Sequence, residues 1–187
     1  MSTKSILYPN EPNWFTNRRG THQKIPEAAA SWIFEPESIT QRLRCCYGNQ
    51  VKVHLLYHQH RSPFLSESRL LKQPGSRYCL TREVMLSANG KPLILARTII
   101  PEKTLIGAQR ILSRLGTRPL GEVIFSYPKL QRLEMQSAYI QPTTWFSKIA
   151  NQIDLNQGIW GRRTVYAIKR RQMLVSEFFL PEIVKYS

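Results

Sequence analysis

The amino-acid sequence predicts an α+β fold of one domain, in which helices pack against an antiparallel β-sheet. Its 187 residues fall within the roughly 100–200 residues of a typical single domain. Two apolar runs between residues 78 and 100 flank Asn89-Gly90, the strongest short signal for a β-hairpin. A second pair of strand-like runs, 164–168 and 173–180, is joined by the short segment 169–172. Because strands joined by hairpins are antiparallel, these runs predict one antiparallel sheet.

The first part of the chain predicts an arm followed by two helices. Residues 1–25 are polar with a few aromatic side chains, and they predict an N-terminal arm that packs on a domain formed by residues 26–187. A helical pattern runs from Pro26 to Ile33, in line with the preference of proline for helix starts. Ser38 precedes a second short helical pattern that contains Leu43, and it is suited to cap that helix.

The rest of the chain alternates between strands and connections. Residues 51–58 alternate in polarity and predict a strand. Residues 61–76 contain two prolines and a glycine and predict a long loop of the kind that often forms a functional lid. After Pro101 we expect a helix that ends at Gly116. Its apolar face is formed by Leu105, Ala108, Leu112 and Leu115. A strand over 131–140 and a long polar insertion over 141–156 follow.

The chain is strongly basic, with 27 Lys and Arg residues against 12 Asp and Glu residues and a formal net charge of +15. Such an excess indicates a polyanionic partner, an anionic small substrate or only a well-solvated surface. A nucleic-acid footprint would cluster on one helix or tract, whereas these basic residues are dispersed along the sequence. Charge alone therefore does not select among the three.

Other features of the sequence bear on the compartment. No stretch approaches the ~18 apolar residues of a membrane-spanning helix, and Met1 to Pro12 lacks the apolar segment of a signal peptide. The three cysteines, Cys45, Cys46 and Cys79, are odd in number and lack metal-binding spacing. These features predict a cytoplasmic protein with free thiols.

Familiar catalytic motifs are weak or missing. His54, His58 and His60 share the polar side of the predicted strand with Lys52, and no Glu lies between them. This pattern favours a solvated face over a zinc site. The sequence has no nucleophile elbow, phosphate-binding glycine loop or dinucleotide fingerprint. Classical hydrolase, nucleotide-binding and dehydrogenase functions are therefore disfavoured.

Two charged residues interrupt apolar strand faces. Arg82 lies in the middle of a face that carries Leu80 and Val84, and Glu177 lies between Val175 and Phe179. An inward arginine needs a partner, and its planar fork suits a carboxylate. A carboxyl among apolar neighbours favours its neutral form, which suits general acid–base chemistry. The alternative is a structural ion pair between Arg82 and Glu177.

Three further segments have both a functional and a structural interpretation. Residues 115–121 hold two glycines and a proline, so their backbone N–H groups either face an anion or only end a helix. Residues 160–163 either bind an anion or have a purely structural role. The tip Lys169-Arg170-Arg171 is interpreted as a solvated turn.

Taken together, these segments resemble the chorismate lyase family from about Trp32 to Pro181, roughly four-fifths of the chain. Each motif is weak alone, but their order and spacing are specific. The motifs are Glu37-Ser38-Ile39-Thr40 with Arg42-Leu43, Ser76-Arg77-Tyr78, Arg82-Glu83-Val84, Ala96-Arg97-Thr98 with Pro101, Leu115-Gly116, Pro119-Leu120-Gly121, Trp160-Gly161-Arg162-Arg163 and Glu177-Phe178-Phe179-Leu180-Pro181.

The resemblance implies an antiparallel sheet with helices packed on it and two lid segments over a buried ligand site. It also implies cleavage of chorismate to 4-hydroxybenzoate and pyruvate without a metal or organic cofactor. By its motifs, Arg82 would bind the ring carboxylate with help from the backbone of Leu120, and Glu177 would meet the 4-hydroxyl end of the ring. Ile39 occupies a lid position where the family usually has methionine. One extra residue between Tyr78 and Arg82, and the long insertion, depart from the family pattern.

The leading hypothesis is a monomeric, cytoplasmic chorismate pyruvate-lyase that supplies ubiquinone or plastoquinone biosynthesis. The alternative is a non-catalytic small-ligand-sensing domain, since effector domains of some transcription regulators have this fold. Such regulators usually carry an N-terminal DNA-binding domain, for which the ~30 residues before Trp32 leave no room. We expect no nucleic-acid partner, while the basic surface leaves a transient membrane contact open.

Overall fold

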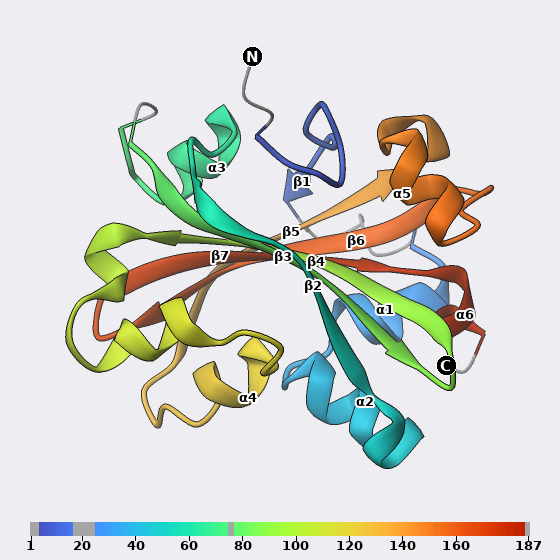
Figure 1. The fold of residues 1–187 in the computed structure, drawn as a ribbon, viewed down its shortest axis with the longest axis horizontal. Coiled ribbons are helices and arrows are strands. Elements are labelled where there is room, and N and C mark those ends of the chain that lie inside the picture. Colours follow the sequence, from blue (N-terminus) through green and yellow to red (C-terminus); the bar gives the residue numbers. More distant parts are fainter. Residues whose placement is uncertain (1–3, 17–24, 75–76, 186–187) are drawn as a thin grey trace.

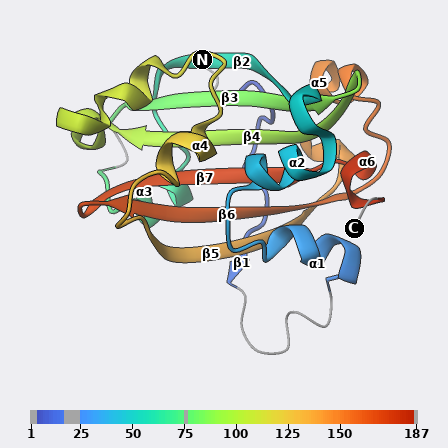
Figure 2. The same ribbon diagram turned by 90° about the horizontal axis from the view of Figure 1, so that it is seen from below.

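The structure, a computed structural model, describes residues 4–16, 25–74 and 77–185. Over these residues the chain forms a seven-stranded antiparallel sheet with the order β1-β5-β6-β7-β4-β3-β2 (Figure 2). The strands are β1 (Phe15–Thr16), β2 (Lys52–Arg61), β3 (Cys79–Ala88), β4 (Lys91–Pro101), β5 (Gln131–Ile140), β6 (Ile159–Ile168) and β7 (Arg171–Phe179). The predicted single-domain α+β fold with an antiparallel sheet is confirmed.

Helices cover both faces of this sheet (Figure 1). The α-helices are α1 (Glu27–Ile33), α2 (Ile39–Tyr47), α3 (Leu65–Leu70), α4 (Leu120–Ile124), α5 (Ser147–Gln152) and α6 (Pro181–Val184). Short 3-10 helices are η2 (Gly48–Gln50), η3 (Glu102–Leu105), η4 (Gly107–Arg114) and η5 (Pro142–Thr144). In Figure 1 the sheet is seen edge-on, with α1, α2 and α4 below it and α3, α5 and residues 4–16 above it.

We call the lower side, covered by α1, α2 and α4, the front face, and the upper side the rear face. Because side chains alternate along a strand, Arg82 belongs to the front face and its neighbour Glu83 to the rear face. Each face has its own apolar core. The front core includes Trp32, Leu43, Val84, Phe179, Leu115 and Val175, and the rear core includes Tyr8, Phe64, Trp145, Phe178 and Leu174.

Both predicted hairpins are present. Asn89 and Gly90 join β3 to β4, and both have positive φ angles of 52° and 76°, as type I′ turns require. Lys169 and Arg170 join β6 to β7, again with positive φ angles, of 49° and 64°. The second turn therefore also has positive φ at both central residues, although it lacks the Asn-Gly pair that favours this conformation.

Several predicted element boundaries were wrong. The long loop predicted over 61–76 was wrong for its described part, residues 61–74, because α3 lies there and buries Glu67 and Ser68 against the rear face. Residues 75 and 76 lie outside the described residues. The helix expected after Pro101 is two shorter 3-10 helices, although Gly116 follows it with a positive φ of 52° as expected. Strand β6 begins at Ile159 and not near residue 164, so residues 160–163 are strand. The insertion 141–156 contains η5 and α5.

The expectation that all three histidines share one polar face was also wrong. A β-bulge between Leu55 and Tyr57 shifts the register of β2 against β3. A one-residue shift moves every later side chain to the other face. As a result His58 lies opposite Arg82, while His54 makes a 2.7 Å hydrogen bond with Ser87 Oγ.

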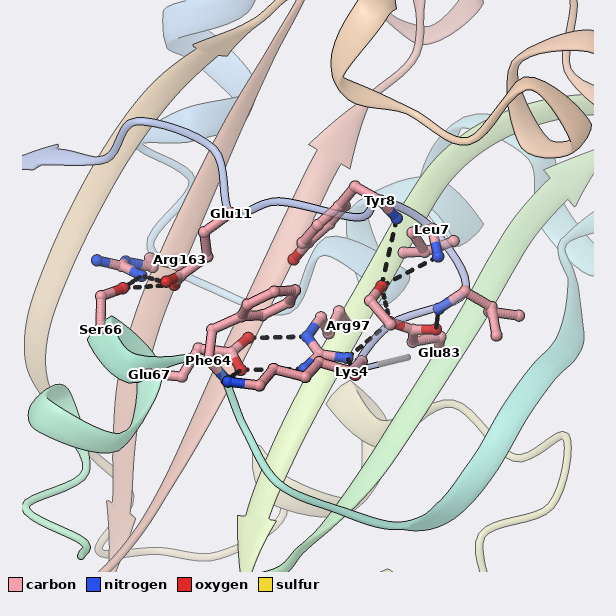
Figure 3. Close-up of polar contacts among 12 residues, drawn as sticks. Lys4, Leu7, Tyr8, Glu11, Phe64, Ser66, Glu67, Glu83, Arg97 and Arg163 are labelled. Carbon is pink, nitrogen blue, oxygen red and sulfur yellow. Dashed lines mark hydrogen bonds and ion pairs between the residues drawn. The ribbon is translucent and has the colours of Figure 1, made fainter. Parts of the chain in front are cut away.

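The rear face carries a buried ion network that holds residues 4–11 against the sheet (Figure 3). Arg97 contacts Glu67 through Nε at 2.8 Å and Nη2 at 3.0 Å, and Glu83 through Nη1 at 2.7 Å. Burial alone would lower the pKa of Arg97, but the charges of Glu67 and Glu83 raise it above its ordinary value. Ser5 Oγ donates to Glu83, and Arg97 donates to the carbonyl of Lys4. The division at residues 25 and 26 stays a prediction.

Candidate active site

A pocket lies on the front face between the sheet and the starts of α2 and α4. It encloses about 560 Å³ when its opening to solvent is included. All four residues predicted for the site line it: Ile39, Arg82, Leu120 and Glu177. The other lining residues are Ser38, Thr40, Val53, Val84, Leu86, Ile94, Ala96, Thr98, Pro119, Gly121, Ile124, Phe125, Tyr166 and Val175.

Arg82 is the cation of the pocket, and its side chain is 2% exposed. Its Nη2 donates to the carbonyls of Gly116 at 3.0 Å and Arg118 at 3.1 Å, and its Nε has no hydrogen-bond partner. Within the described residues, no carboxylate pairs with it, and burial lowers the pKa of Arg82 to about 10. A buried guanidinium without a counter-ion is costly. A carboxylate from a ligand would provide that counter-ion.

Glu177 does not pair with Arg82, so the structural ion pair considered from the sequence was wrong. Its Oε2 accepts a 2.7 Å hydrogen bond from Nε of Arg162, which lies opposite it on β6. The side chain of Glu177 is 14% exposed, while that of Arg162 is almost fully buried. Glu177 therefore has a cation beside it in addition to the apolar neighbours expected from the sequence, and Arg162 offsets the desolvation of the carboxylate.

Arg162 also connects Glu177 to the segment that precedes α2. Its Nη1 donates to the carbonyls of Ile33 at 3.0 Å and Glu35 at 2.8 Å. Arg132 adds hydrogen bonds to the carbonyls of Glu35 at 2.9 Å and Glu37 at 3.1 Å. Two arginines thus hold the chain immediately before Ile39 against the sheet.

The starts of α2 and α4 meet across the pocket. Ser38 caps α2 by accepting from the backbone N–H of Gln41 at 3.4 Å. A Cβ placed on Gly121 would lie 2.5 Å from Ser38 Oγ, so a side chain there would require Ser38 or the helix to shift. At the surface, Arg44 of α2 lies 2.7 Å from Glu122 of α4.

Ile39 and Leu120 are the first residues of these two helices. The backbone N–H groups in the first turn of a helix have no acceptor within the helix. The backbone N–H of Leu120 is such a group, and the carbonyls that Arg82 contacts lie two and four residues before Leu120. The start of α4 and Arg82 therefore lie at the same end of the pocket.

The distance between Arg82 and Glu177 follows from the sheet register. Arg82 pairs with Thr98, which pairs with Val175, two residues before Glu177. Ideal sheet spacings put the Cα atoms of Arg82 and Glu177 roughly 12 Å apart. Both side chains line the pocket, so a ligand in the space between them would lie near a cation and a carboxylate. The walls beside that space are apolar, apart from Ser38, Thr40, Thr98 and Tyr166.

The described residues contain no group of three or more His, Cys, Asp or Glu side chains placed to hold a metal ion. Cys45 and Cys46 are exposed and Cys79 is buried, and none of the three is in a disulfide. Over the same residues, no helix is both long and apolar enough to span a bilayer.

Comparisons with known proteins agree with this geometry. Residues 10–186 match the family model described as chorismate lyase. The chain belongs to the chorismate lyase family. It is 38% identical over 154 residues to a probable chorismate pyruvate-lyase of Methylococcus capsulatus, covering 82% of this chain and 95% of that protein. It is 33% identical to one of Methylobacillus flagellatus, covering 82% and 87%. As a member of this family the chain is a carbon–oxygen lyase.

Solved structures share the fold of this chorismate lyase family member at low sequence identity. The C-terminal domain of PhnF aligns with a TM-score of 0.57 and 12% identity, covering 78% of this chain and 89% of that one. The ligand-binding domain of a putative GntR-family regulator from Bordetella bronchiseptica aligns with a TM-score of 0.54 and 13% identity, covering 72% and 86%. These likenesses concern the fold.

Arg162 lies in the segment 160–163, for which the sequence left a functional and a structural interpretation open, and its pairing with Glu177 was not predicted. Its alternation with Thr164 and Tyr166 along β6 would have placed it on the front face, had the strand been started at Ile159. Tyr166 lies in the predicted strand 164–168 but was not predicted to line the site, because the sequence does not show which face of that strand meets the pocket. Burial raises the pKa of Tyr166, and the charge of Glu177 adds to this effect. Arg162 and Tyr166 thus form the surroundings of Glu177.

Proposed function

We propose that this pocket cleaves chorismate to 4-hydroxybenzoate and pyruvate, as the initial step of quinone biosynthesis. The observation that carries the proposal is Arg82, a buried guanidinium with no carboxylate partner among the described residues, in a pocket that also holds Glu177. Membership of the chorismate lyase family gives the substrate class. We further propose that the protein acts as a monomer in the cytoplasm.

In this proposal the ring carboxylate of chorismate binds Arg82. The guanidinium has donors to spare beyond those used by Gly116 and Arg118, and the backbone N–H of Leu120 supports the same carboxylate. A charge-assisted contact in a dry pocket is strong and directional. Arg82 therefore fixes one end of the ring.

Glu177 meets the other end of the ring, at C4 and its hydroxyl group. The reaction removes the hydrogen on C4 as a proton and breaks the bond between C3 and the ether oxygen. The enolpyruvyl group leaves with the bonding electrons and, after taking up a proton, becomes pyruvate. Because the remaining ring becomes aromatic, orientation and charge stabilisation suffice without a covalent intermediate. Arg162 holds the Glu177 carboxylate in place for this contact.

The direct experiment is to mix the purified protein with chorismate and follow both products. We expect 4-hydroxybenzoate and pyruvate to appear in equal amounts, without added metal. A folded protein that forms neither product would contradict the proposal. In cells, we expect the gene to restore quinone production to a strain that has lost its own chorismate lyase.

A non-catalytic ligand sensor is the second candidate, because the solved structures with this fold include ligand-binding domains of regulators. Because the sequence identity to these structures is low, their similarity shows the fold alone. The same assay separates the two functions, since a sensor would bind 4-hydroxybenzoate or chorismate without turnover.

A further inference from the structure

One end of the sheet combines exposed basic and aliphatic side chains. We call this surface the basic end and define it by Lys103, Ile106, Arg110, Ile111, Arg114, Lys169 and Arg170. Residues 102–118 and 168–172 contain seven Lys or Arg residues and a single acidic residue, Glu102. A sizeable part of the +15 net charge thus falls on two segments.

The tertiary structure brings these two segments together at the left of Figure 1. Thr104 Oγ1 donates a 2.7 Å hydrogen bond to the carbonyl of Gln172, and Arg171 Nη1 donates to the carbonyl of Ile106. The turn between β6 and β7 therefore lies against η3 and the residue that follows it. Lys169 and Arg170 thus come close to the segment that carries Lys103 and Ile106.

The basic residues of this surface have no acidic partners in the described part of the chain. Lys103, Arg110, Arg114, Lys169 and Arg170 are exposed and take part in no ion pair there. The opposite end of the sheet differs, because Lys91 and Lys185 both pair with Glu182. At the basic end, the repulsion among the positive charges is not offset by ion pairs within the described residues. This is expected of a surface that binds an anionic partner.

The turn at the basic end has two basic residues at positions whose backbone conformation favours other residue types. Lys169 and Arg170 both adopt positive φ angles, which favour Gly, Asn or Asp. The turn at the opposite end has the same geometry and uses Asn89-Gly90. A residue choice that conflicts with its local conformation marks a functional constraint. Here the constraint is the pair of positive charges.

Two isoleucines stand among these charges. Ile106 is 57% exposed and Ile111 is 41% exposed. Residues three apart eclipse each other on a 3-10 helix, so Ile111 and Arg114 share one ridge of η4, while Leu112 is buried in the front core. Aliphatic groups beside Lys and Arg suit the boundary between lipid headgroups and acyl chains.

We propose that the basic end docks on an anionic lipid surface, with Ile106 and Ile111 entering the headgroup boundary and the basic side chains contacting phosphate groups. Nucleic acid fits the isoleucines less well, because single strands are held by stacking on aromatic rings and duplexes by a helix or ribbon in a groove. The surface uses no residue of the pocket, so this inference stands apart from the proposed lyase reaction.

The test is co-sedimentation of the full chain with phosphatidylcholine vesicles that contain or lack phosphatidylglycerol. We expect binding only to the vesicles with phosphatidylglycerol, and weaker binding as salt rises. The double variant Lys169→Asn/Arg170→Asn removes two charges and suits the turn, so we expect at least about tenfold weaker binding. Ile106→Ser/Ile111→Ser should also weaken binding, because it removes the inserted groups.

Matched controls come from elsewhere on the surface. Lys52→Asn/Lys148→Asn removes two exposed lysines outside the basic end, and Leu55→Ser replaces a leucine that is 39% exposed on β2. These variants should bind vesicles like the original chain. Circular dichroism and the lyase assay in solution should be unchanged in all four variants.

The proposal is overturned if the chain does not bind anionic vesicles at low salt, or if either basic-end variant binds as well as the original chain. It is also overturned if the controls lose binding equally, or if single-stranded DNA or RNA is bound while vesicles are not. A failure of the lyase reaction would appear only in the solution assay, so the two proposals are tested separately.

Discussion

Nε of Arg162 lies 2.7 Å from Oε2 of Glu177, and the same guanidinium holds the carbonyls of Ile33 and Glu35. The carboxylate of the pocket is therefore connected, through one buried side chain, to the segment that leads into α2. Burial alone would lower the pKa of Arg162, but the charge of Glu177 raises it above its ordinary value. Arg162 thus remains charged and acts as a positioning residue for Glu177.

We expect Arg162→Met to be strongly destabilising, because it leaves a largely buried carboxylate without its cation. Breaking such a pair from one side costs about 3–5 kcal/mol of unfolding free energy. The double variant Arg162→Met/Glu177→Gln should recover part of this loss. Urea denaturation of both variants and of Glu177→Gln measures the effect. Equal stability of Arg162→Met and the double variant would show that the pair is unimportant.

Kinetic measurements on variants of Glu177 and Arg162 distinguish a positioning role of Arg162 from a role in stability alone. Glu177→Gln should lower kcat with little change in KM, since the ring carboxylate is still held by Arg82. We expect Arg162→Met to lower kcat as well, because Glu177 is then no longer held in place. Arg162→Lys should restore part of that loss. A merely structural role of Arg162 would instead lower the amount of active protein without changing kcat per folded molecule.

Arg82→Met should weaken the binding of 4-hydroxybenzoate by about 10–100-fold, because hydrogen bonds to charged groups contribute roughly 1.5–3 kcal/mol. Since Arg82 has no acidic partner in the described residues, we expect a smaller stability loss than for Arg162→Met. Titration calorimetry with 4-hydroxybenzoate gives the affinity. Arg114→Gln, at an exposed arginine outside the pocket, is the matched control and should bind normally.

Gly121→Ala should push α4 away from α2, because its Cβ would lie 2.5 Å from Ser38 Oγ. We expect a higher KM for chorismate and a lower melting temperature. In the double variant Gly121→Ala/Ser38→Gly the clashing hydroxyl is gone, and glycine is tolerated at a helix N-cap. The double variant should therefore recover most of the affinity. If Gly121→Ala alone left KM unchanged, the close contact between α2 and α4 would not matter for chorismate binding.

Arg97→Met should be among the most destabilising changes on the rear face. It leaves Glu67 and Glu83 buried without their cation and removes a hydrogen bond to the carbonyl of Lys4. We expect a loss of about 3–5 kcal/mol and faster cleavage by proteases within residues 4–16. Limited proteolysis and urea denaturation measure these effects. The exposed Arg69→Met on α3 is the control and should resist cleavage like the original chain.

His58 should make the stability pH-dependent below its ordinary pKa of 6.5. Burial lowers the pKa of His58, and the positive charges of Arg82 and His60 add to this. The unfolded chain then takes up a proton before the folded chain does, so the unfolding free energy falls as the pH drops through and below 6.5. His58→Gln should remove part of this decrease in urea denaturation at a series of pH values. His54→Gln, on the other face, should not.

The sequence predicted much of this fold from local signals. The Asn89-Gly90 turn, the Ser38 cap and the alternation around Arg82 are short-range patterns, and each agrees with the structure. The bulge in β2 could not be predicted in this way, because its register is set by pairing with β3. The same holds for β6, whose first residues are strand only because β5 and β7 flank them.

For the pocket, the sequence by itself determined which residues are unusual: an arginine and a glutamate on apolar strand faces, together with the ordered motifs of one family. Only the tertiary structure decided how they are paired. Glu177 faces Arg162 and not Arg82, because β7 lies between β6 and β4 and the register sets its cross-strand neighbours. Likewise, the sequence determined the net charge of +15, while the contact of η3 with the β6–β7 turn gathered part of it at one end. Pairing and clustering depend on long-range contacts, which no local pattern encodes.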